Sequence, residues 1–378
     1  MQLIYLNVGL SSVFESQIYS LLVHFSELKL FTQITLLYGY SSKTEIDQVN
    51  RLFRQKPIDL IFYKNYPNYP VFNWLQKRSI HTALKKLGPE RKDVLIHIRG
   101  DLLAWQACQP LKRNKFNLEN VLVDIRGAAM EENDEFSSRF KPLKQFKLLN
   151  YLKGLSQLHK YYHISTISLK LKEYVQQRIN KKDPEPVIIS CFAGNIFRYS
   201  EKDRLKVRKE LGLTERDVLL VFSSGGLAEW QNNQVLSELT GRGLKILNLS
   251  KRVIDHPDII SMFLPYEEMP AYLSASDIAL ILRNESIVNK VSSPVKFSEF
   301  VCSGLPVISN GNVLLVSNYI NETGYGIIIS NPREIDLNLT NKLLDFSRKK
   351  IADEGYKRFS INKIANQYID QYKKMVQK

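Results

Sequence analysis

The sequence predicts an α/β protein with two doubly wound parallel sheets, and three observations support this prediction. The first is length, because 378 residues exceed the usual size of one domain. The second is a series of short apolar runs rich in Val, Ile and Leu, which is typical of strands buried on both faces of a parallel sheet. The third is that segments with helical spacing separate these runs, as in repeated β-then-α units.

The predicted strands are too numerous for one compact open sheet, so two sheets are the more economical arrangement. In chain order they are Leu3–Val8, Ile34–Tyr38, Leu60–Tyr63, Val94–Ile98, Val121–Ile125, Val187–Ser190, Val218–Phe222, Leu244–Leu247, Ile278–Leu282, Pro306–Ser309 and Gly326–Ile329.

A polar segment with two prolines, Asn180–Pro186, indicates where the two domains meet. We therefore expect an N-terminal domain of residues 1–183 and a C-terminal domain of residues 184–359. The final segment has one apolar stripe with helical spacing, and Ser360 is suited to be its N-cap. The stripe consists of Ile361, Ile364, Tyr368, Tyr372 and Met375. We expect this helix, residues 360–378, to pack back on the N-terminal domain.

Composition is that of a globular protein, with 44% hydrophobic residues and no apolar run that approaches the length of a membrane span. The opening residues resemble a first strand rather than a signal peptide. Cys108, Cys191 and Cys302 are far apart and odd in number, which favours buried thiols in a reducing compartment over disulfides or a metal site. We therefore expect a cytoplasmic protein.

The net charge is +15, and most of the excess lies in residues 1–180. A positive surface attracts phosphorylated ligands, anionic membranes or nucleic acid, but it can equally serve only solubility. Within this half, residues 140–162 mix lysines with leucines. Such a helix can rest on the inner face of an anionic membrane, or it can pack its leucines in the core and leave the lysines solvated.

The most informative segment is a predicted helix of about ten residues that begins near Ser293 and ends before Gly304. Ser293 is a suitable N-cap, Pro294 a suitable first residue and Gly304 a suitable left-handed terminus. Lys296 lies in the first turn, where a cation is disfavoured unless an anion sits beside it.

Glu299 follows Lys296 by three residues and lies on the same side of this helix. A carboxylate there can accept hydrogen bonds from a ribose, and a lysine can bind phosphate. Arg283 follows the preceding predicted strand, where open α/β sheets bind ligands. The alternative is an ordinary surface pair of Lys296 and Glu299, with Arg283 a solvated strand end.

At this point the sequence resembles a known family. The segments 273–280 and 293–308, with Arg283 between them, are similar to the donor-site signature of glycosyltransferase family 4 and its relatives. The resemblance implies the GT-B architecture, in which two Rossmann-like domains face a cleft. It also implies that Lys296 binds the diphosphate and Glu299 the ribose of a nucleotide sugar, and that Ser293 belongs to the donor-binding residues. A second glutamate of the family is replaced by Val291, which leaves the contacts to the sugar hydroxyls undefined.

Two further segments resemble parts of the family's donor site. Ser224, Gly225 and Gly226 follow a predicted strand, where backbone N–H groups can approach a phosphate; a plain strand–helix turn is the alternative. Tyr266 could stack on a nucleotide base, or it could be a half-buried turn residue.

In the N-terminal half, polar residues follow several predicted strands. Gly9 and Ser11 follow the first strand, and Ser12 with Glu15 forms a predicted capping box. The family resemblance places this loop, and the charged residues Asp124, Arg126 and Glu131, on the acceptor side of the cleft, with a plain strand–helix turn as the alternative for the loop. Arg99 follows another predicted strand, and its charge either pairs with a neighbouring one or also faces the cleft. His97 could contact the transferred sugar or be a structural histidine, and Asp124 with Arg126 could be a structural ion pair.

Together these features predict a hexosyltransferase-like enzyme that transfers a sugar from a nucleotide-diphosphate sugar to a hydroxyl of a glycan or lipid-linked acceptor. The resemblance implies retention and a role in polysaccharide biosynthesis, and Arg283, Lys296 and His97 are the predicted catalytic residues. Because no Asp-x-Asp pair is present, we expect neither a metal nor another cofactor. The alternatives are a nucleotide-sugar epimerase or hydrolase, or a non-catalytic basic scaffold for membrane or nucleic acid, although no nucleic-acid motif is present.

Overall fold

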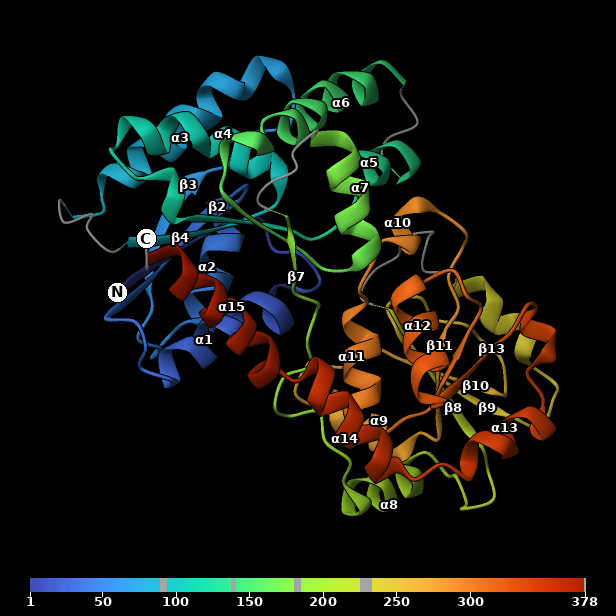
Figure 1. The fold of residues 1–378 in the computed structure, drawn as a ribbon. Helices are drawn as coiled ribbons and strands as arrows, with labels where there is room; N and C mark the ends of the chain where they lie inside the picture. The colour runs from blue at the N-terminus through green and yellow to red at the C-terminus, as the bar shows by residue number, and fades with distance from the viewer. Residues whose placement is uncertain (89–93, 137–140, 180–184, 225–232, 377–378) are drawn as a thin grey trace. The chain divides into compact units, whose positions relative to one another are not determined.

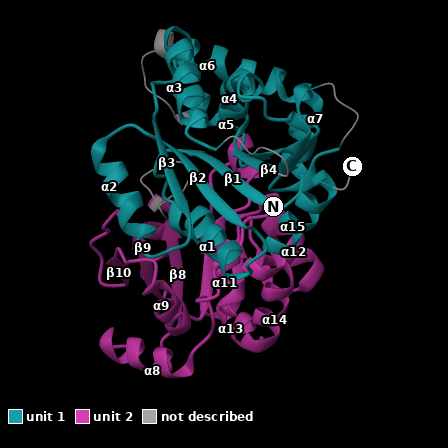
Figure 2. Cartoon of the chain, turned by 90° about the vertical axis from the view of Figure 1, so that its left-hand side faces the viewer, with its two compact units in different colours: residues 1–189, 365–378 teal, residues 190–364 magenta. Residues whose placement is uncertain are grey.

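A computed structural model describes residues 1–88, 94–136, 141–179, 185–224 and 233–376. The chain divides into two compact units, residues 1–189 with 365–378 and residues 190–364, here called unit 1 and unit 2 (Figure 2). The predicted divide between residues 183 and 184 falls at residues 180–184, which lie outside the described residues.

Unit 1 contains a parallel sheet with the strand order β3-β2-β1-β4-β5-β6-β7. Its strands are β1 (Gln2–Val8), β2 (Gln33–Tyr40), β3 (Asp59–Lys64), β4 (Val94–Arg99), β5 (Val121–Ile125), β6 (His163–Thr166) and β7 (Val187–Ile188). Its helices are α1 (Ser20–Glu27), α2 (Lys43–Leu52), α3 (Asn73–Lys85), α4 (Asp101–Arg113), α5 (Ala129–Phe136), α6 (Lys141–Ser156) and α7 (Leu169–Ile179). Helices α3, α4 and α6 lie on one side of the sheet and α1 and α2 on the other (Figure 1).

Unit 2 contains a second parallel sheet with the strand order β10-β9-β8-β11-β12-β13. Its strands are β8 (Leu219–Ser224), β9 (Lys245–Ser250), β10 (Ile259–Met262), β11 (Ile278–Ile281), β12 (Val307–Ser309) and β13 (Gly326–Ile328). Its helices are α8 (Glu201–Glu210), α9 (Met269–Ala275), α10 (Ile287–Lys290), α11 (Val295–Cys302), α12 (Leu314–Thr323), α13 (Leu337–Leu344) and α14 (Arg348–Phe359).

Both faces of the unit 2 sheet are covered, as the continuous apolar runs predict. Leu219 and Val221 of β8 contribute to one core cluster, which also contains Phe297 of α11. Leu220 and Phe222 of the same strand contribute to a second cluster on the opposite face. Alternate residues of one strand therefore stabilise two separate cores.

Every predicted strand corresponds to a strand of the structure, but β6 and β10 were not predicted. Strand β6 has the sequence His-Ile-Ser-Thr, and its Ser165 and Thr166 are completely buried. Polar side chains in a buried strand remove the apolar signal that identifies such strands. Strand β10 has four residues and lies at the edge of its sheet, so it too gives a short and weak signal.

The C-terminal helix α15 (Ile361–Val376) confirms the predicted stripe and its cap. The Oγ of Ser360 accepts a hydrogen bond from the backbone N–H of Lys363 at 3.3 Å. All the stripe residues are buried, and residues 365–378 belong to unit 1.

Two predicted helix starts are wrong. The first helix begins with a π-helical turn, Glu15–Tyr19, and has Phe14 rather than Ser12 at its N-cap. Helix α11 has Pro294 at its N-cap and no side-chain cap, so Ser293 lies outside it and the helix has eight residues. The predicted terminus is confirmed, since Gly304 follows the C-cap with a left-handed φ of 77°.

The three cysteines are free and buried, as predicted. In the part of the chain that the structure describes, no helix is both long and apolar enough to span a bilayer.

Candidate functional site

The order of strands in unit 2 identifies one place as the candidate ligand site. Strands β8 and β11 are neighbours, but the chain leaves β8 toward β9 on one side and leaves β11 toward β12 on the other. Open α/β sheets bind ligands at the carboxyl ends of strands at such a switch point. Ser224 is the last residue of β8, and Arg283 follows the end of β11 by two residues. Gly225 and Gly226 lie outside the described residues.

Arg283 is a buried cation with an unfilled hydrogen-bonding position. Its side chain is largely shielded from solvent, and its Nη1 has no hydrogen-bond partner among the described residues. Burial lowers the pKa of the guanidinium to about 10, so Arg283 remains charged at neutral pH. A buried charge that lacks a partner is costly, and an anionic ligand would offset that cost.

The backbone of Arg283 is fixed by two asparagines after β12 that were not predicted as site residues. Asn310 accepts a hydrogen bond from the N–H of Arg283 at 3.1 Å and donates one to its carbonyl at 2.7 Å. Asn312 donates a second hydrogen bond to the same carbonyl at 2.8 Å. The sequence did offer a signal for them, because a polar segment follows the apolar run of β12 and residues that follow parallel strands lie together at the carboxyl edge of the sheet.

Helix α11 connects β11 to β12, so its N-terminus lies at the same edge of the sheet as Arg283. Lys296 is in its first turn, and the Lys296 Nζ lies 2.8 Å from Oε2 of Glu299. The side chain of Glu299 is only 1% exposed and that of Lys296 is 22% exposed. The exposed pair of Lys290 and Glu285 in the same unit has 41% and 73% exposure, so Lys296 and Glu299 are not an ordinary surface pair.

Glu299 also has a carboxylate oxygen that can bind a ligand. Its Oε1 is buried and has no hydrogen-bond partner among the described residues. Burial raises the pKa of Glu299, and the adjacent Lys296 ammonium opposes this effect. One carboxylate oxygen therefore holds the lysine, and the other can accept a hydroxyl hydrogen bond.

The segment that begins unit 2 fixes the first turn of α11. Ser293 Oγ accepts a hydrogen bond from the N–H of Cys191 at 3.1 Å, and Ser298 Oγ donates one to the carbonyl of Cys191 at 3.2 Å. The Ser293 hydroxyl thus holds the start of the helix in place, and the predicted contact of Ser293 with the donor stays a prediction.

Tyr266 lies in the turn after β10 and is half-buried. Its ring meets Phe197 edge-on, with centroids 5.4 Å apart. A Cβ at Gly194 would lie 2.8 Å from the Tyr266 hydroxyl, so the glycine leaves room for this ring. These contacts show how the ring is held, and base stacking by Tyr266 stays a prediction.

The segment 273–280, which contributed to the family resemblance, has a structural role at the opposite edge of the sheet. Asp277 immediately precedes β11 and forms ion pairs with Arg204 at 2.8 Å and with Arg208 at 3.2 Å. Arg208 is almost completely buried. The signature thus combines residues that anchor the sheet with residues that lie at its carboxyl edge.

In unit 1 the corresponding switch point lies between β1 and β4. Gly9 follows β1 and Gly100 follows β4, and both have a positive φ. Ser11 is exposed, and Arg99 at the end of β4 is half-buried. The predicted acceptor-side residues Gly9, Ser11 and Arg99 thus lie at one edge of the unit 1 sheet.

His97, by contrast, lies in the core of unit 1. Its ring is completely buried and stacks on Tyr5 with centroids 4.3 Å apart, and a 2.6 Å hydrogen bond joins its Nδ1 and the hydroxyl of Tyr372. Burial lowers the pKa of His97 despite the nearby Asp124 carboxylate. Because Tyr5, Tyr368 and Tyr372 surround this buried ring, the geometry favours the structural alternative over the predicted sugar contact.

Asp124 and Arg126 belong to the same buried cluster. The carboxylate of Asp124 accepts hydrogen bonds from Ser165 at 2.9 Å and from Tyr368 at 3.0 Å. Arg126 Nη1 lies 3.5 Å from Asp124 Oδ1. Burial alone would raise the pKa of Asp124, but Arg126 and His97 more than offset it and hold this pKa below its ordinary value.

Glu131 lies in α5 and contacts two residues of α7. Its carboxylate accepts hydrogen bonds from the hydroxyl of Tyr174 and, at 2.9 Å, from Arg178. Only 12% of its side chain is exposed. A direct contact of Glu131 with an acceptor therefore stays a prediction.

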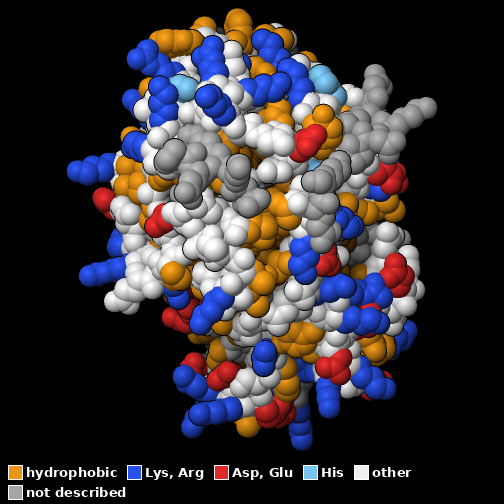
Figure 3. Space-filling model, turned by 60° about the vertical axis from the view of Figure 1, so that its left-hand side comes forward, with side chains coloured by type: hydrophobic (Ala, Val, Ile, Leu, Met, Phe, Trp, Pro, Cys, Tyr) orange, Lys and Arg blue, Asp and Glu red, His pale blue; other side chains and the backbone are white. Residues whose placement is uncertain are grey.

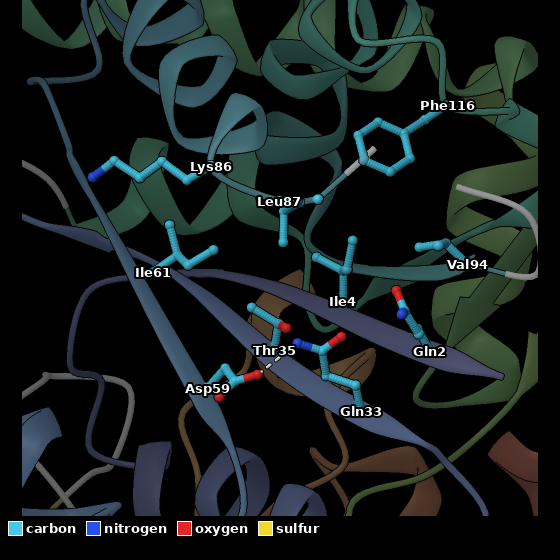
Figure 4. Close-up of a pocket in the computed structure, with 11 residues that line it drawn as sticks. Gln2, Ile4, Gln33, Thr35, Asp59, Ile61, Lys86, Leu87, Val94 and Phe116 are labelled. Carbon is cyan, nitrogen blue, oxygen red and sulfur yellow. Dashed lines mark hydrogen bonds between the residues drawn. The ribbon is translucent and has the colours of Figure 1, made fainter. Parts of the chain in front are cut away.

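A hollow of about 540 Å³ in unit 1 is unsuited to be the site (Figure 4). Its lining includes Gln2, Gln33, Asp59 and Val94, which are the first residues of β1, β2, β3 and β4. It therefore opens at the amino edge of the sheet, opposite the switch point. Among the described residues, no cluster of three His, Cys, Asp or Glu side chains is arranged to hold a metal ion.

No protein-family profile matches the sequence, and a comparison with curated proteins gives no match. Solved structures do match over essentially the whole chain. A glycosyltransferase from Rickettsia africae is 14% identical with a TM-score of 0.70, covering 100% of this chain and 98% of its own. Anabaena HepE in complex with UDP-glucose is 12% identical with a TM-score of 0.68, covering 99% and 100%. Sucrose-phosphate synthase from Thermosynechococcus elongatus is 15% identical with a TM-score of 0.68, covering 99% of both chains.

These likenesses establish the fold, because the paired parallel sheets and the coverage of both chains agree. The chain has the GT-B architecture of two Rossmann-like α/β units, as predicted. At 12–15% identity the comparisons define the fold and not the substrate.

Proposed function

We propose that this chain is a glycosyltransferase that uses a nucleotide-diphosphate sugar as its donor. The observation that carries the proposal is Arg283, a charged and buried guanidinium that lacks a partner on Nη1 among the described residues. It follows β11 at the switch point of a doubly wound sheet, which is where such folds bind nucleotides. A diphosphate supplies the anion that this position lacks.

The roles of the other residues follow from their chemistry. Lys296, in the first turn of α11, would bind the diphosphate together with backbone N–H groups of the helix N-terminus. Glu299 would accept a ribose hydroxyl on its unoccupied Oε1. Ser224 and the glycines that follow it would approach the phosphates from β8. Arg283 and Lys296 would then neutralise the departing diphosphate, so that catalysis comes mainly from positioning and electrostatics.

The fold comparisons support a nucleotide-sugar donor, because HepE with the same architecture was solved with UDP-glucose bound. We further propose that the acceptor is a hydroxyl of a glycan or lipid-linked glycan, bound by unit 1 near Gly9, Ser11 and Arg99. We also propose that the transfer retains the anomeric configuration of the sugar and needs no metal ion. The proposed metal independence rests on the absence of an Asp-x-Asp pair from the sequence.

The proposal is tested by thermal-shift titration with UDP, GDP and their sugars. A ligand at a concentration of about 100 Kd stabilises a protein by about 3 kcal/mol, which raises Tm by several degrees. One donor class should stabilise the wild type, and Lys296→Ala and Glu299→Ala should each abolish most of that stabilisation.

The matched control is an exposed pair on α8, Lys206 and Glu210, because this helix binds Asp277 at the opposite edge of the sheet. Lys206→Ala removes an exposed lysine–glutamate pair away from the proposed site and should leave the ligand-induced shift unchanged. The same shift in wild type, Lys296→Ala and Glu299→Ala would reject the assignment. Release of free sugar in the absence of any acceptor would instead indicate a hydrolase.

A further inference from the structure

One face of unit 1 combines exposed apolar side chains with cations. It is formed by the 3-10 turn Pro70–Phe72, α3 and α6, and it is here called the α3–α6 face. Its apolar members, with their exposed fractions, are Val71 (79%), Trp74 (64%), Phe146 (55%), Leu149 (48%) and Leu152 (46%). Scattered exposed apolar residues are normal, but a contiguous group of this kind marks an interaction surface.

Direct side-chain contacts show that these elements lie side by side. Asn150 of α6 donates hydrogen bonds to Asn68 at 2.8 Å and to Asn73, the first residue of α3, at 3.1 Å. Trp105 of α4 lies between Lys77 of α3 and Lys153 of α6, with the two ammonium groups 4.8 Å and 5.9 Å from its ring. The apolar residues of α3 and α6 therefore belong to one surface.

Among the described residues, the elements that form this face have cationic and no acidic side chains, and the acidic neighbour is Asp134 of the adjacent α5, which pairs with Lys144 of α6 at 3.1 Å. The sequence contains no Asp or Glu in residues 64–89 or in residues 136–172. Burial, and after it the nearby cations Lys153, Lys160 and Arg113, lower the pKa of Lys77. The lysines of this face thus repel one another, and an anionic partner would relieve that repulsion. Figure 3 shows Lys and Arg side chains beside hydrophobic ones at the end of the molecule that carries α3 and α6 in Figure 1.

The cationic surface continues past α3. A shallow hollow of about 330 Å³ between α3 and the ends of β2 and β3 is lined by Lys64, Arg78 and Lys86 together with Tyr40 and Tyr66, and none of its lining residues is acidic. Basic and aromatic side chains in a shallow depression suit a phosphate-bearing headgroup.

Helix α6 differs from one of the two sequence alternatives, the one in which it packs its leucines in the core and leaves only its lysines solvated. Leu155 is buried, but Leu149 and Leu152 lie on the same exposed face as Phe146 and Lys153. Its outer surface is therefore not a purely solvated lysine face. A helix with cations and large apolar groups exposed together is typical of the membrane interface.

We propose that the α3–α6 face docks the protein on the surface of a bilayer that contains anionic lipids. Trp74 and Phe146 would enter the interfacial layer, where aromatic side chains are favoured. Arg78, Lys147 and Lys153 would contact acidic headgroups. Nucleic acid would use the cations but not Val71, Leu149 and Leu152, so a bilayer explains more of the surface. Such docking would deepen the proposed function by giving the enzyme access to a lipid-linked acceptor.

The test is flotation of the full chain with vesicles of phosphatidylcholine alone or mixed 7:3 with phosphatidylglycerol, in 0.15 M salt. The anionic vesicles should bind at least about tenfold more protein. Each basic residue near an anionic surface contributes about fivefold to partitioning, so Arg78→Glu with Lys153→Glu should lower it at least about 25-fold. The charge-matched control is Lys202→Glu with Lys349→Glu, two exposed lysines of unit 2 that should change partitioning much less.

The apolar contribution is tested separately. Trp74→Ser with Leu149→Ser should lower partitioning about tenfold, whereas Leu205→Ser with Leu169→Ser replaces residues of similar exposure (53% and 54%) outside this face and should not. All variants should keep the wild-type Tm and donor-induced shift, which separates this test from that of the donor site. Absence of vesicle binding, equal losses in control and test variants, or tight binding of RNA or an acidic protein without vesicle binding would each overturn the proposal.

Discussion

Unit 2 contains two buried arginines, and the structure predicts opposite consequences for their replacement by methionine. Arg208 Nη1 lies 3.2 Å from Asp277 and the guanidinium also donates to backbone carbonyls. Arg283 has no hydrogen-bond partner on Nη1 among the described residues. Methionine has a comparable length but no charge, so the substitution separates the cost of burying each cation from the benefit of its partners.

For Arg283, a pKa lowered to about 10 corresponds to a cost of about 3 kcal/mol for keeping the charge buried. Arg283→Met should recover part of this cost, about 1–2 kcal/mol, and raise the Tm of the ligand-free protein by about 3–6 °C. The backbone contacts with Asn310 and Asn312 do not involve the side chain and should remain. Arg208→Met should instead destabilise unit 2 by about 3–5 kcal/mol, because it breaks a buried ion pair.

The assay combines scanning calorimetry of both variants with steady-state kinetics. Arg283→Met should lower kcat/KM by about 100-fold or more, as removal of a group that stabilises the transition state does, and should lose the donor-induced Tm shift. A gain in stability with a loss of activity is typical of a site residue. If Arg283→Met destabilises the protein as much as Arg208→Met does, Arg283 has a structural partner and the reasoning fails. Wild-type kinetics in a stable Arg283→Met variant would equally refute it.

Three further predictions concern stability, and each is checked by urea denaturation. Asp124→Asn should lower the free energy of unfolding by about 3–5 kcal/mol at pH 7, because Arg126 loses its buried counter-ion. Since the pKa of Asp124 is lowered in the folded state, this advantage of the wild type should persist above about pH 4 and fade at lower pH. Burial raises the pKa of Asp101 to about 6, so the stability of the wild type falls as pH rises through 6; the free energy of unfolding of Asp101→Asn should exceed that of the wild type by about 3 kcal/mol at pH 8 and match it at pH 4. Gly304→Ala, whose Cβ would lie 2.5 Å from a backbone oxygen, should cost more than about 3 kcal/mol, whereas Gly324→Ala, with a similar φ of 72° and open space, should cost about 1 kcal/mol; equal costs would contradict the steric reasoning.

The sequence allowed the two sheets to be predicted because most strands are buried on both faces and therefore uniformly apolar. Strand β6 is not uniformly apolar although it is buried, because Ser165 and Thr166 are buried in a polar network. The hydroxyl of Ser165 bonds Asp124 of the neighbouring strand, so its burial depends on a partner 41 residues away in sequence. Periodicity contains no information about such a partner.

The candidate donor site was predictable in residue type but not in environment. A cation in the first turn of a helix indicated that Lys296 is unusual, and the structure brings it to Glu299 at 2.8 Å. That Glu299 is buried, and that Arg283 is held by Asn310 and Asn312, depends on how α11 and β12 pack. These are the features that distinguish a ligand site from a surface ion pair, and they arise only in the folded unit.

His97 shows why a polar residue in a strand cannot be assigned to core or site from its neighbours in sequence. Its Nδ1 partner, Tyr372, lies 275 residues away on α15, and Tyr368 of the same helix bonds Asp124. Because α15 supplies both hydroxyls, His97 of β4 and Asp124 of β5 have partners inside unit 1 and do not need a ligand to compensate their burial. Acceptor contacts in this unit are therefore expected from Ser11 and Arg99, which remain accessible at the edge of the sheet, rather than from His97.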